Sequence, residues 1–347
     1  MTKLSIEPDI TTEINKFKLT FRHILNHVDG TQMARSITDL GEYLTQHQGK
    51  HLRTRLLFLA VKAAGGQVNK LHWHLAGIIE LIHNAALLHD DILDEATSRR
   101  HHATFNRRWD NETSILYGDL LLAQALKLIN HLSSFAIRHC IIEVTNAMCC
   151  GELTHTKEKF NLDLSESDYM NIIRAKTARL FELACYLGSY YAGYNIKQSN
   201  LLNNEPWALK GKLSSPKVIK ALTQYGLNFG MAYQIMDDCM DLVSTEKNLG
   251  KTVDRDLTKG KITLPIIRLI QSTPKKQRPS INKFITTNTT PAKKQRLAQL
   301  LTKSQSLAYA YAQVNKYVTS SKSYLKPISN SPDKKSLVQL ADNILLH

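Results

Sequence analysis

Proline is absent from a long part of this 347-residue chain, since none occurs between Pro8 and Pro206. Because proline breaks helix interiors, its absence leaves that span free to form long helices. Alternating β-branched runs bounded by turn residues are scarce as well. Apolar residues instead recur at spacings of three and four, as in the segment 75–93. These patterns predict an all-α fold.

The chain also lacks the sequence features of export, of a membrane span and of a cysteine-based site. Residues 1–18 are mixed polar and charged, without the basic start and apolar run of a signal peptide. No stretch reaches the roughly 18 uninterrupted apolar residues of a transmembrane helix. The five cysteines form no C-x-x-C pair, although Cys149 and Cys150 are adjacent. We therefore expect a cytoplasmic protein with reduced thiols.

The formal net charge is +15, which is compatible with nucleic acid, an anionic membrane surface or a polyanionic substrate as partner. The basic runs at 275–278, 293–296 and 334–335 lie beside prolines and Ser/Thr-rich stretches, so we interpret them as solvated loops. Aromatic residues suited to base stacking are not interleaved with them. We expect no nucleic-acid partner, and peripheral association with an anionic membrane stays open.

A coarse map of the chain is a series of helices without an internal repeat or a clear domain boundary. Helices are expected at about 12–27, 33–46, Gly49 to Gly65, 71–96, 112–130, 134–158, 165–193 and 216–244. After Leu264, helical segments alternate with looser connections. The polar stretch 195–217 contains proline and glycine, and we expect a long loop there. One helical bundle domain over residues 1–347 is the prediction.

The first acidic cluster lies in the segment 81–100. Asp90 and Asp94 are four residues apart, so on a helix they share a face, and Asp91 lies beside them. Carboxylates on an apolar helix need compensating positive charge, and Mg²⁺ prefers such oxygen ligands. Arg99 and Arg100 follow and are suited to binding phosphate oxygens. The alternative is an exposed acidic patch paired with these arginines.

The second acidic cluster repeats this spacing at Asp237, Asp238 and Asp241. It is followed by Lys251 and Lys261, each preceded by a glycine that lets a backbone approach phosphate closely. The Walker pattern is absent. If the two clusters face one another, they could hold several Mg²⁺ ions around one diphosphate. The ions would act as Lewis acids, which suits ionisation of a carbon–oxygen bond to diphosphate.

With these motifs the chain resembles the trans-isoprenyl diphosphate synthase family, and in particular its long-chain polyprenyl branch. The likeness extends from about Gly49 to Pro265. It implies the all-α isoprenoid synthase fold, two or three Mg²⁺ ions and a homodimer. Isopentenyl diphosphate and an allylic diphosphate are the implied substrates. The Gly118-Asp119 pair also matches the family.

The resemblance implies a role for each matching residue. The metal ligands would be Asp90, Asp91, Asp94, Asp237, Asp238 and Asp241. Isopentenyl diphosphate would contact Lys50, Arg53, His83 and Arg100, and the allylic diphosphate Arg99, Lys176, Thr177 and Gln234. Lys251 and Lys261 match the family's phosphate-binding lysines. Asp90, Asp94, Asp237, Asp241 and Lys176 would be the catalytic set.

Four positions depart from the family pattern without removing an implied metal ligand. Thr54 replaces the proline that usually follows the arginine of the basic motif, and His101 replaces a glycine after the arginine pair. His155 replaces a glutamine shortly after Gly151-Glu152, and Asp254 stands where glycine is common. These departures bear on local loop geometry and efficiency rather than on the reaction class.

The implied reaction adds five carbons to an allylic diphosphate by attack of isopentenyl diphosphate on an allylic cation. Ala85 and Ala86 lie one turn before the first cluster, where a bulky aromatic in the family closes the product pocket. Two alanines therefore favour a long product, and the alternative is that they only permit close helix packing. Farnesyl diphosphate as primer and octaprenyl diphosphate for a quinone side chain are expected from the resemblance.

Other interpretations remain open at this point. A shorter-chain synthase, making farnesyl or geranylgeranyl diphosphate, shares the same motifs. A terpene cyclase has the same scaffold but needs no second substrate site, and its second metal motif usually differs. A non-catalytic subunit of a heteromeric synthase would be expected to have eroded acidic motifs, whereas both are intact here.

Overall fold

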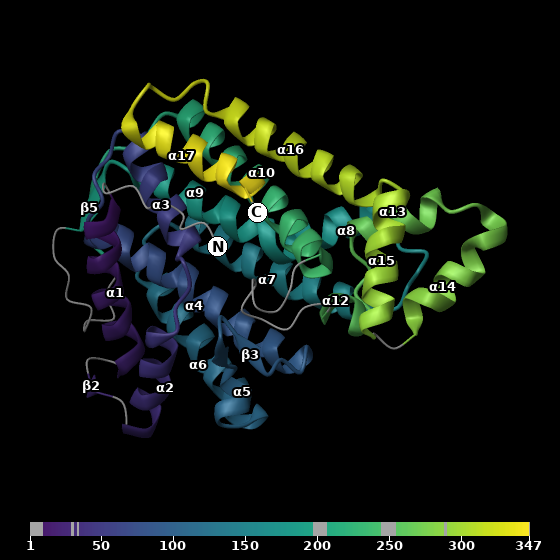
Figure 1. Cartoon of the computed structure of the whole chain (residues 1–347). Helices are drawn as coiled ribbons and strands as arrows, with labels where there is room; N and C mark the ends of the chain where they lie inside the picture. The colour runs from purple at the N-terminus through teal and green to yellow at the C-terminus, as the bar shows by residue number, and fades with distance from the viewer. Residues whose placement is uncertain are drawn as a thin grey trace.

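The computed structural model describes residues 10–28, 31–32, 35–196, 207–243, 255–287 and 290–346. Within them helices predominate, and each of three small sheets consists of two short antiparallel strands. The predicted all-α fold is confirmed. The arrangement of the helices is shown in Figure 1, where α16 (Ser306–Tyr324) runs along the upper edge above α10 (Pro216–Val243).

Two long helices carry the acidic clusters. The first, α4 (Lys70–Leu93), begins at Asn69, whose side chain accepts a hydrogen bond from the backbone N–H of Leu71. The His72 side chain bonds back to the Asn69 backbone and completes a capping box. The second, α10, begins with Pro216, a residue whose fixed φ suits the first position of a helix.

The remaining elements surround these two helices. The other helices are α1 (Thr11–Asn26), α2 (Arg35–Gln46), α3 (Leu52–Ala63), α5 (Phe105–Arg108), α6 (Asn111–Asn130), α7 (Phe135–Lys157), α8 (Glu166–Ile173), α9 (Arg179–Tyr191), α12 (Arg255–Thr258), α13 (Leu264–Ser272), α14 (Arg278–Thr286), α15 (Pro291–Lys303) and α17 (Pro332–Asn343). Short 3₁₀ turns are η3 (Lys275–Gln277) and η4 (Ile344–Leu346), and η2 (Arg174–Ala178) is a π-helical turn. The strands are β1 (His27–Val28), β2 (Thr31–Gln32), β3 (Ser98–Arg99), β4 (His102–Ala103), β5 (Tyr194–Ile196) and β6 (Leu209–Gly211).

Helices α3 and α9 lie between two hydrophobic clusters and contribute to both. Leu56 and Phe181 belong to the cluster built with α10, α13 and α16, whereas Leu57 and Leu180 belong to the one built with α1, α4 and α6. Close contact of the two helices depends on Gly188, because a Cβ there would lie 2.3 Å from the Leu57 carbonyl oxygen. Each apolar side chain fully buried in this way stabilises the fold by about 1.5–3 kcal/mol.

The basic runs interpreted as solvated loops lie in helical elements instead: 275–278 in η3 and the start of α14, 293–296 in α15, and 334–335 in α17. Three predicted elements also differ from the structure. The helix expected over about 71–96 ends at Leu93, and Asp94 is its C-cap residue with φ of −95°. The helix expected over about 165–193 is interrupted by η2, where one turn is wider than α-helical. The expected loop 195–217 includes β5 and β6, in which Asn195 pairs with Lys210, and residues 197–206 lie outside the described part of the chain. A strand of three residues, such as β5 or β6, is too short to leave a periodic pattern in the sequence.

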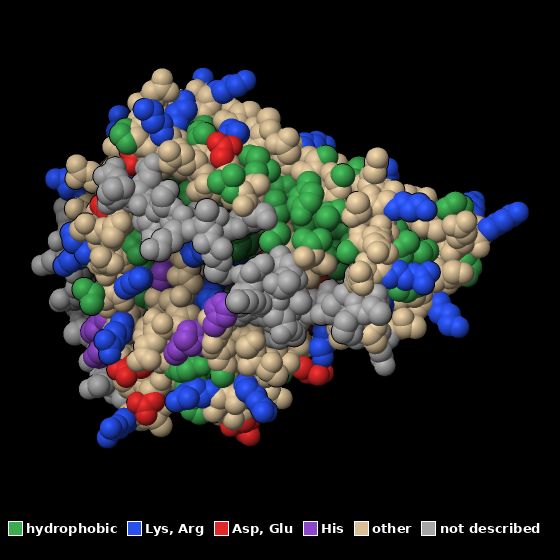
Figure 2. Space-filling view, in the orientation of Figure 1, with side chains coloured by type: hydrophobic (Ala, Val, Ile, Leu, Met, Phe, Trp, Pro, Cys, Tyr) green, Lys and Arg blue, Asp and Glu red, His purple; other side chains and the backbone are tan. Residues whose placement is uncertain are grey.

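Among the helices that the structure describes, none has both the length and the apolar character needed to cross a bilayer. All five cysteines are free thiols. On the face shown in Figure 2, Lys and Arg side chains are scattered around the molecule rather than gathered in one stripe.

Candidate active site

A chain of polar contacts connects the two acidic clusters. The Lys261 ammonium lies 2.7 Å from Asp94 Oδ2 on the first cluster and 3.7 Å from Asp256 Oδ1 on α12. The backbone N–H of Asp256 donates in turn to Asp241 Oδ2 at 3.3 Å, on the second cluster. Lys261 and Asp256 therefore connect the acidic end of α4 to that of α10.

A second lysine approaches the first cluster from the π-helical turn. The Lys176 ammonium lies 3.3 Å from Asp90 Oδ2 and also pairs with Glu152 on α7. Burial lowers the pKa of Lys176, but Asp90 and Glu152 outweigh that effect and raise the pKa overall, so the side chain stays protonated. π-Helical turns are frequent at functional sites because they redirect a side chain. Lys176 therefore lies beside the first acidic cluster, and its predicted contact with the allylic diphosphate stays a prediction.

The two lysines act differently on the carboxylates of the first cluster. Burial raises the pKa of Asp90, and the opposing effect of Lys176 is smaller. Burial also favours a raised pKa at Asp94, but there the hydrogen-bonded Lys261 outweighs it and the pKa is lowered. His155 lies in the same electrostatic environment, and burial together with both lysines lowers its pKa to about 3, so its imidazole is neutral.

Asp91 is bound by the first arginine of the pair. Arg99 donates from Nε at 3.1 Å and from Nη2 at 2.8 Å to Asp91 Oδ1. Burial lowers the pKa of Arg99, but Asp91 outweighs it, with smaller contributions from Asp90 and Asp237. Arg99 is therefore held by Asp91 and also feels the charge of Asp237 in the second cluster. The predicted role of Asp91 as a metal ligand stays a prediction.

Asp238 is held in a hydrogen-bonded chain that sequence reasoning did not foresee. The Tyr169 hydroxyl donates to Oδ2 at 2.5 Å, and Gln234 Nε2 donates to Oδ1 at 2.7 Å. Thr177 Oγ1 donates to Gln234 Oε1 at 2.7 Å, so two predicted substrate contacts are joined. Burial is the main reason that the pKa of Asp238 is raised to about 8. Its predicted role as a metal ligand stays a prediction.

A group of basic residues predicted to bind isopentenyl diphosphate gathers beside these clusters. Arg53 Nη1 donates to His83 Nε2 at 3.0 Å, and the Arg53 guanidinium lies 4.3 Å from the centre of the Phe181 ring. The pKa of His83 is far below its ordinary value, mainly through burial and then through Arg53. Burial and the charge of Arg100 lower the pKa of Lys50. The cations are close enough to affect one another, which suits a bound polyanion.

The arginine pair is divided by a tight hairpin. Strands β3 and β4 are joined by Arg100 and His101, whose φ values are +53° and +66°. A two-residue turn with both φ values positive is the type I′ pattern of hairpins. Arg99 consequently faces Asp91, whereas Arg100 lies over Gly49, where a Cβ would be 2.3 Å from its Nη2.

The two alanines before the first cluster differ in exposure. Ala85 is fully buried within the core, whereas Ala86 is partly exposed. Gly118 on α6 provides room for His89 of α4, because a Cβ there would lie 2.3 Å from His89 Nε2. Asp119 Oδ1 lies 3.6 Å from that same imidazole nitrogen.

Some predicted residues cannot be placed, and some functional candidates were missed. Lys251 and Asp254 lie outside the described residues. Glu152, Asp256 and Tyr169 contact predicted site residues but were not among them. Glu152 and Asp256 are acidic residues near recognised motifs, which could have suggested them, whereas nothing in the local sequence marks Tyr169.

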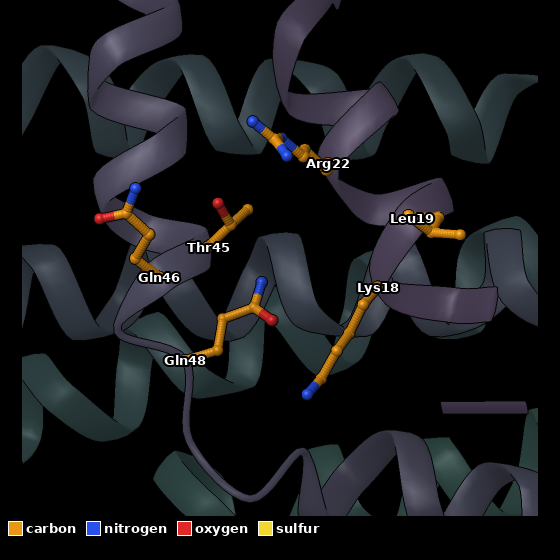
Figure 3. A pocket seen from close by; sticks show the side chains of 6 residues that line it. All are labelled: Lys18, Leu19, Arg22, Thr45, Gln46 and Gln48. Carbon is orange, nitrogen blue, oxygen red and sulfur yellow. The ribbon is translucent and has the colours of Figure 1, made fainter. Parts of the chain in front are cut away.

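The three aspartates of the first cluster each pair with a basic residue, whereas Asp238 of the second is bonded to Tyr169 and Gln234. Within the described ranges, no three His, Cys, Asp or Glu side chains converge closely enough to hold one ion. A separate cavity of about 280 Å³ lies between α1 and the end of α2 (Figure 3). It is lined by Lys18, Leu19, Arg22, Thr45, Gln46 and Gln48. One lining residue, Gln48, has its Oε1 2.7 Å from His51 Nε2.

Comparison with known proteins agrees with this arrangement. A family model described as polyprenyl synthetase matches residues 34–303. Heptaprenyl diphosphate synthase component 2 of Bacillus subtilis is 27% identical over 97% of this chain and 92% of its own length. All-trans-nonaprenyl-diphosphate synthase (geranyl-diphosphate specific) of Rhodobacter capsulatus is 31% identical over 88% of this chain and 87% of its own length.

A solved structure has the same fold. The polyprenyl synthase of Caulobacter crescentus, crystallised with calcium and isoprenyl diphosphate, superposes with a TM-score of 0.84 at 26% identity. The superposition covers 97% of this chain and 95% of that one. The family match, the shared fold and the joined acidic clusters agree, and this chain belongs to the polyprenyl synthetase family of prenyltransferases.

Proposed function

We propose that this enzyme is a Mg²⁺-dependent trans-polyprenyl diphosphate synthase that extends farnesyl diphosphate with isopentenyl diphosphate to octaprenyl diphosphate, for a quinone side chain. The observation that carries the proposal is the contact chain from Asp94 through Lys261 and Asp256 to Asp241, which joins two acidic clusters at one place. Two basic groups flank that place, as two diphosphate substrates require.

The donor set fits Mg²⁺. Asp90, Asp94, Asp237 and Asp241 offer only carboxylate oxygens, the ligand type that this ion prefers. Separate carboxylates suit an ion that takes one or two protein ligands and completes its shell with water and substrate phosphate. When bound, the ions would withdraw negative charge from the diphosphate leaving group. Asp91 and Asp238, which orient Arg99 and Gln234, would complete the set of metal ligands when substrate binds.

The allylic diphosphate would be held by basic residues that already point at the clusters. Lys176 and Lys261 remain protonated and lie against Asp90 and Asp94. Their charges would stabilise the negative charge that develops on the leaving diphosphate. Arg99, fixed by Asp91, adds a planar donor suited to phosphate oxygens.

The second substrate would be held beside the first. Lys50, Arg53 and Arg100 would bind the diphosphate of isopentenyl diphosphate, with neutral His83 fixed by Arg53 as a further polar contact. This placement directs the double bond of isopentenyl diphosphate towards the allylic cation. No side chain is required as base, since the departing diphosphate can accept the proton. The protein contributes orientation and electrostatics.

The proposed chain length rests on the α4 alanines and on the relatives. Ala86 is partly exposed one turn before the first cluster, and its small side chain would let a growing apolar tail pass there. Relatives include octaprenyl, heptaprenyl and nonaprenyl synthases, and also a geranylgeranyl diphosphate synthase. A shorter product is therefore the second candidate.

A homodimer is part of the proposal. Helix α6 exposes Leu116 and Leu126, and its neighbour α7 exposes Phe135 and Leu153, each more than half exposed in the single chain. Large exposed apolar side chains on adjacent helices are typical of an interaction surface, and a second copy related by two-fold symmetry would cover them. The net charge of +15 supports contact with an anionic membrane, where an apolar product could leave.

The test is incubation of the purified full chain with isopentenyl diphosphate, farnesyl diphosphate and Mg²⁺, followed by chromatography of the dephosphorylated product. A C40 alcohol is expected, and Asp90→Ala or Asp237→Ala should nearly abolish turnover. Hydrocarbon or cyclic alcohol release would identify a cyclase instead. Inactivity of the pure chain that is relieved by a second, different subunit would identify one component of a heteromeric synthase. Full activity of either aspartate variant would refute the metal site.

A further inference from the structure

A buried carboxylate lies behind the basic group, and no role has yet been given to it. Glu80 on α4 is 4% exposed. Thr54 Oγ1 donates to its Oε1 at 2.8 Å, and His51 Nδ1 lies 3.4 Å from its Oε2. Thr54 and His51 are themselves buried. Both oxygens of one carboxylate therefore face the start of α3.

The two contacts lie on either side of Arg53. Helix α3 begins at Leu52, and its N-cap residue His51 provides no side-chain cap. His51 has φ of +47°, a conformation that costs a non-glycine residue about 1–3 kcal/mol and persists only when its surroundings hold it. The helix N-terminus carries partial positive charge, which a nearby carboxylate stabilises. Glu80 thus supplies both the partner for His51 and the anion for this helix end.

The Thr54 contact is specific to this chain relative to the family pattern described above, because a proline at that position has no hydroxyl to donate. On the other side of Glu80, the same α4 face carries His83, which accepts a hydrogen bond from Arg53. Glu80 therefore contacts the α3 residues on either side of Arg53, and it lies on the same helix as His83, the hydrogen-bond partner of Arg53.

The charge balance of the empty site also depends on this group. Burial alone would raise the pKa of Glu80, but the contacts with His51, His83 and Thr54 outweigh it and lower the pKa to about 2. The carboxylate is therefore ionised. Burial lowers the pKa of Arg53, and Glu80 is the largest opposing influence. Without a buried anion, the converging cations would repel one another before substrate binds.

We infer that Glu80 is a positioning residue for the isopentenyl diphosphate site, which through His51 and Thr54 holds the start of α3 so that Arg53 is ready for the diphosphate. The inference rests on the proposed function of that site. Glu80 does not touch the substrate; it acts through the residues that do. It should therefore affect the binding of one substrate and not of the other.

The test is steady-state kinetics of Glu80→Gln in the full chain with Mg²⁺. Glutamine keeps the shape and an acceptor for Thr54 but removes the charge. KM for isopentenyl diphosphate should rise about tenfold, equivalent to about 1.4 kcal/mol. KM for the allylic diphosphate should stay within about twofold, because Lys176 and Lys261 do not contact this network. Thr54→Val should raise KM for isopentenyl diphosphate by a smaller factor. Glu182→Gln, which breaks a glutamate–arginine pair with Arg179 on α9, is the matched control.

Equal increases in both KM values, or a lower kcat with both KM values unchanged, would overturn the inference. Circular dichroism and thermal unfolding report whether each variant folds, and if Glu80→Gln does not fold, Thr54→Val decides by the same ratio of KM values. Calorimetric binding of isopentenyl diphosphate alone separates the two proposals. If the native chain binds this compound but does not condense it, the proposed function fails, and weaker binding by Glu80→Gln would still support the role of Glu80.

Discussion

Replacing Lys261 by glutamine should destabilise the metal-free protein much more than the same replacement of its near neighbour Lys259. The Lys261 side chain is 6% exposed, and its ammonium lies 2.7 Å from Asp94, which is 19% exposed. Lys259 lies 2.8 Å from Glu95, but that glutamate is 81% exposed. The two pairs have nearly equal distances and differ in burial, so they isolate the effect of desolvation.

The magnitude follows from the burial of the Lys261 pair. Removing one partner of a buried ion pair costs about 3–5 kcal/mol, because the other charge is left without compensation. Asp94 keeps some contact with water, so we expect the lower limit, about 3 kcal/mol, in Lys261→Gln. The exposed pair contributes little, since water already solvates both charges. Lys259→Gln should therefore be close to the native protein.

The assay is urea unfolding of the native chain and both variants, first with a chelator and then with Mg²⁺ and inorganic pyrophosphate. A divalent cation near Asp94 would supply the positive charge that the variant lacks, so the difference between Lys261→Gln and native protein should become smaller with the ion. Turnover of Lys261→Gln should still fall, by about 10²-fold, because a donor to the leaving diphosphate is lost.

Two results would refute the reasoning. Equal losses of stability in Lys261→Gln and Lys259→Gln would mean that burial does not govern the energy of this contact. A difference that is the same with and without Mg²⁺ would mean that the ion does not approach Asp94.

Three further predictions follow from the geometry. Ala86→Phe should shorten the product with little change in stability, whereas Ala85→Phe, at a fully buried position, should overpack the core and cost about 1–3 kcal/mol of stability. Chromatography measures the product length and urea unfolding the stability. An unchanged product length in Ala86→Phe would contradict the proposed path of the tail. Tyr169→Phe should lower stability by about 1–3 kcal/mol in urea unfolding, since Asp238 loses a buried donor; a neutral outcome would mean that water replaces the hydroxyl. His101→Gly should raise the unfolding midpoint slightly. The left-handed backbone costs histidine about 1–2 kcal/mol, which is more than the roughly 0.5–1 kcal/mol that the greater backbone entropy of unfolded glycine costs. A lower midpoint would contradict the turn assignment.

Much of the fold could be predicted because long amphipathic helices leave a periodic pattern in the sequence. The predicted ends of the helices carrying the acidic clusters lie within a few residues of those of α4 and α10. The interruption at Lys176 could not be predicted, because residues of a π-helical turn are ordinary helix formers, and only packing against neighbouring helices selects the wider turn. The short hairpins were missed for a related reason, since pairs of two-residue strands have no period of their own.

The site was predictable where residue type alone restricts chemistry. Paired aspartates at helical spacing, followed by arginine or lysine, suit a metal and a phosphate wherever they lie. The partners Tyr169 and Glu80 could not be found in that way, because each acts through a contact with a residue far away in the chain. Tyr169 and Asp238 are a pair of this kind, joined at 2.5 Å across 69 positions.

By itself, the sequence determined the helical class, the two acidic motifs and the basic motif, since these depend on spacing within one helix or one short segment. Only the tertiary structure decided how the charges are distributed. It placed Lys261 between Asp94 and Asp256, directed Arg99 to Asp91 through a hairpin, and put Glu80 behind Arg53. The physical reason is that the energy of a charge depends on its burial and its nearest partners, and folding brings those partners from distant parts of the chain.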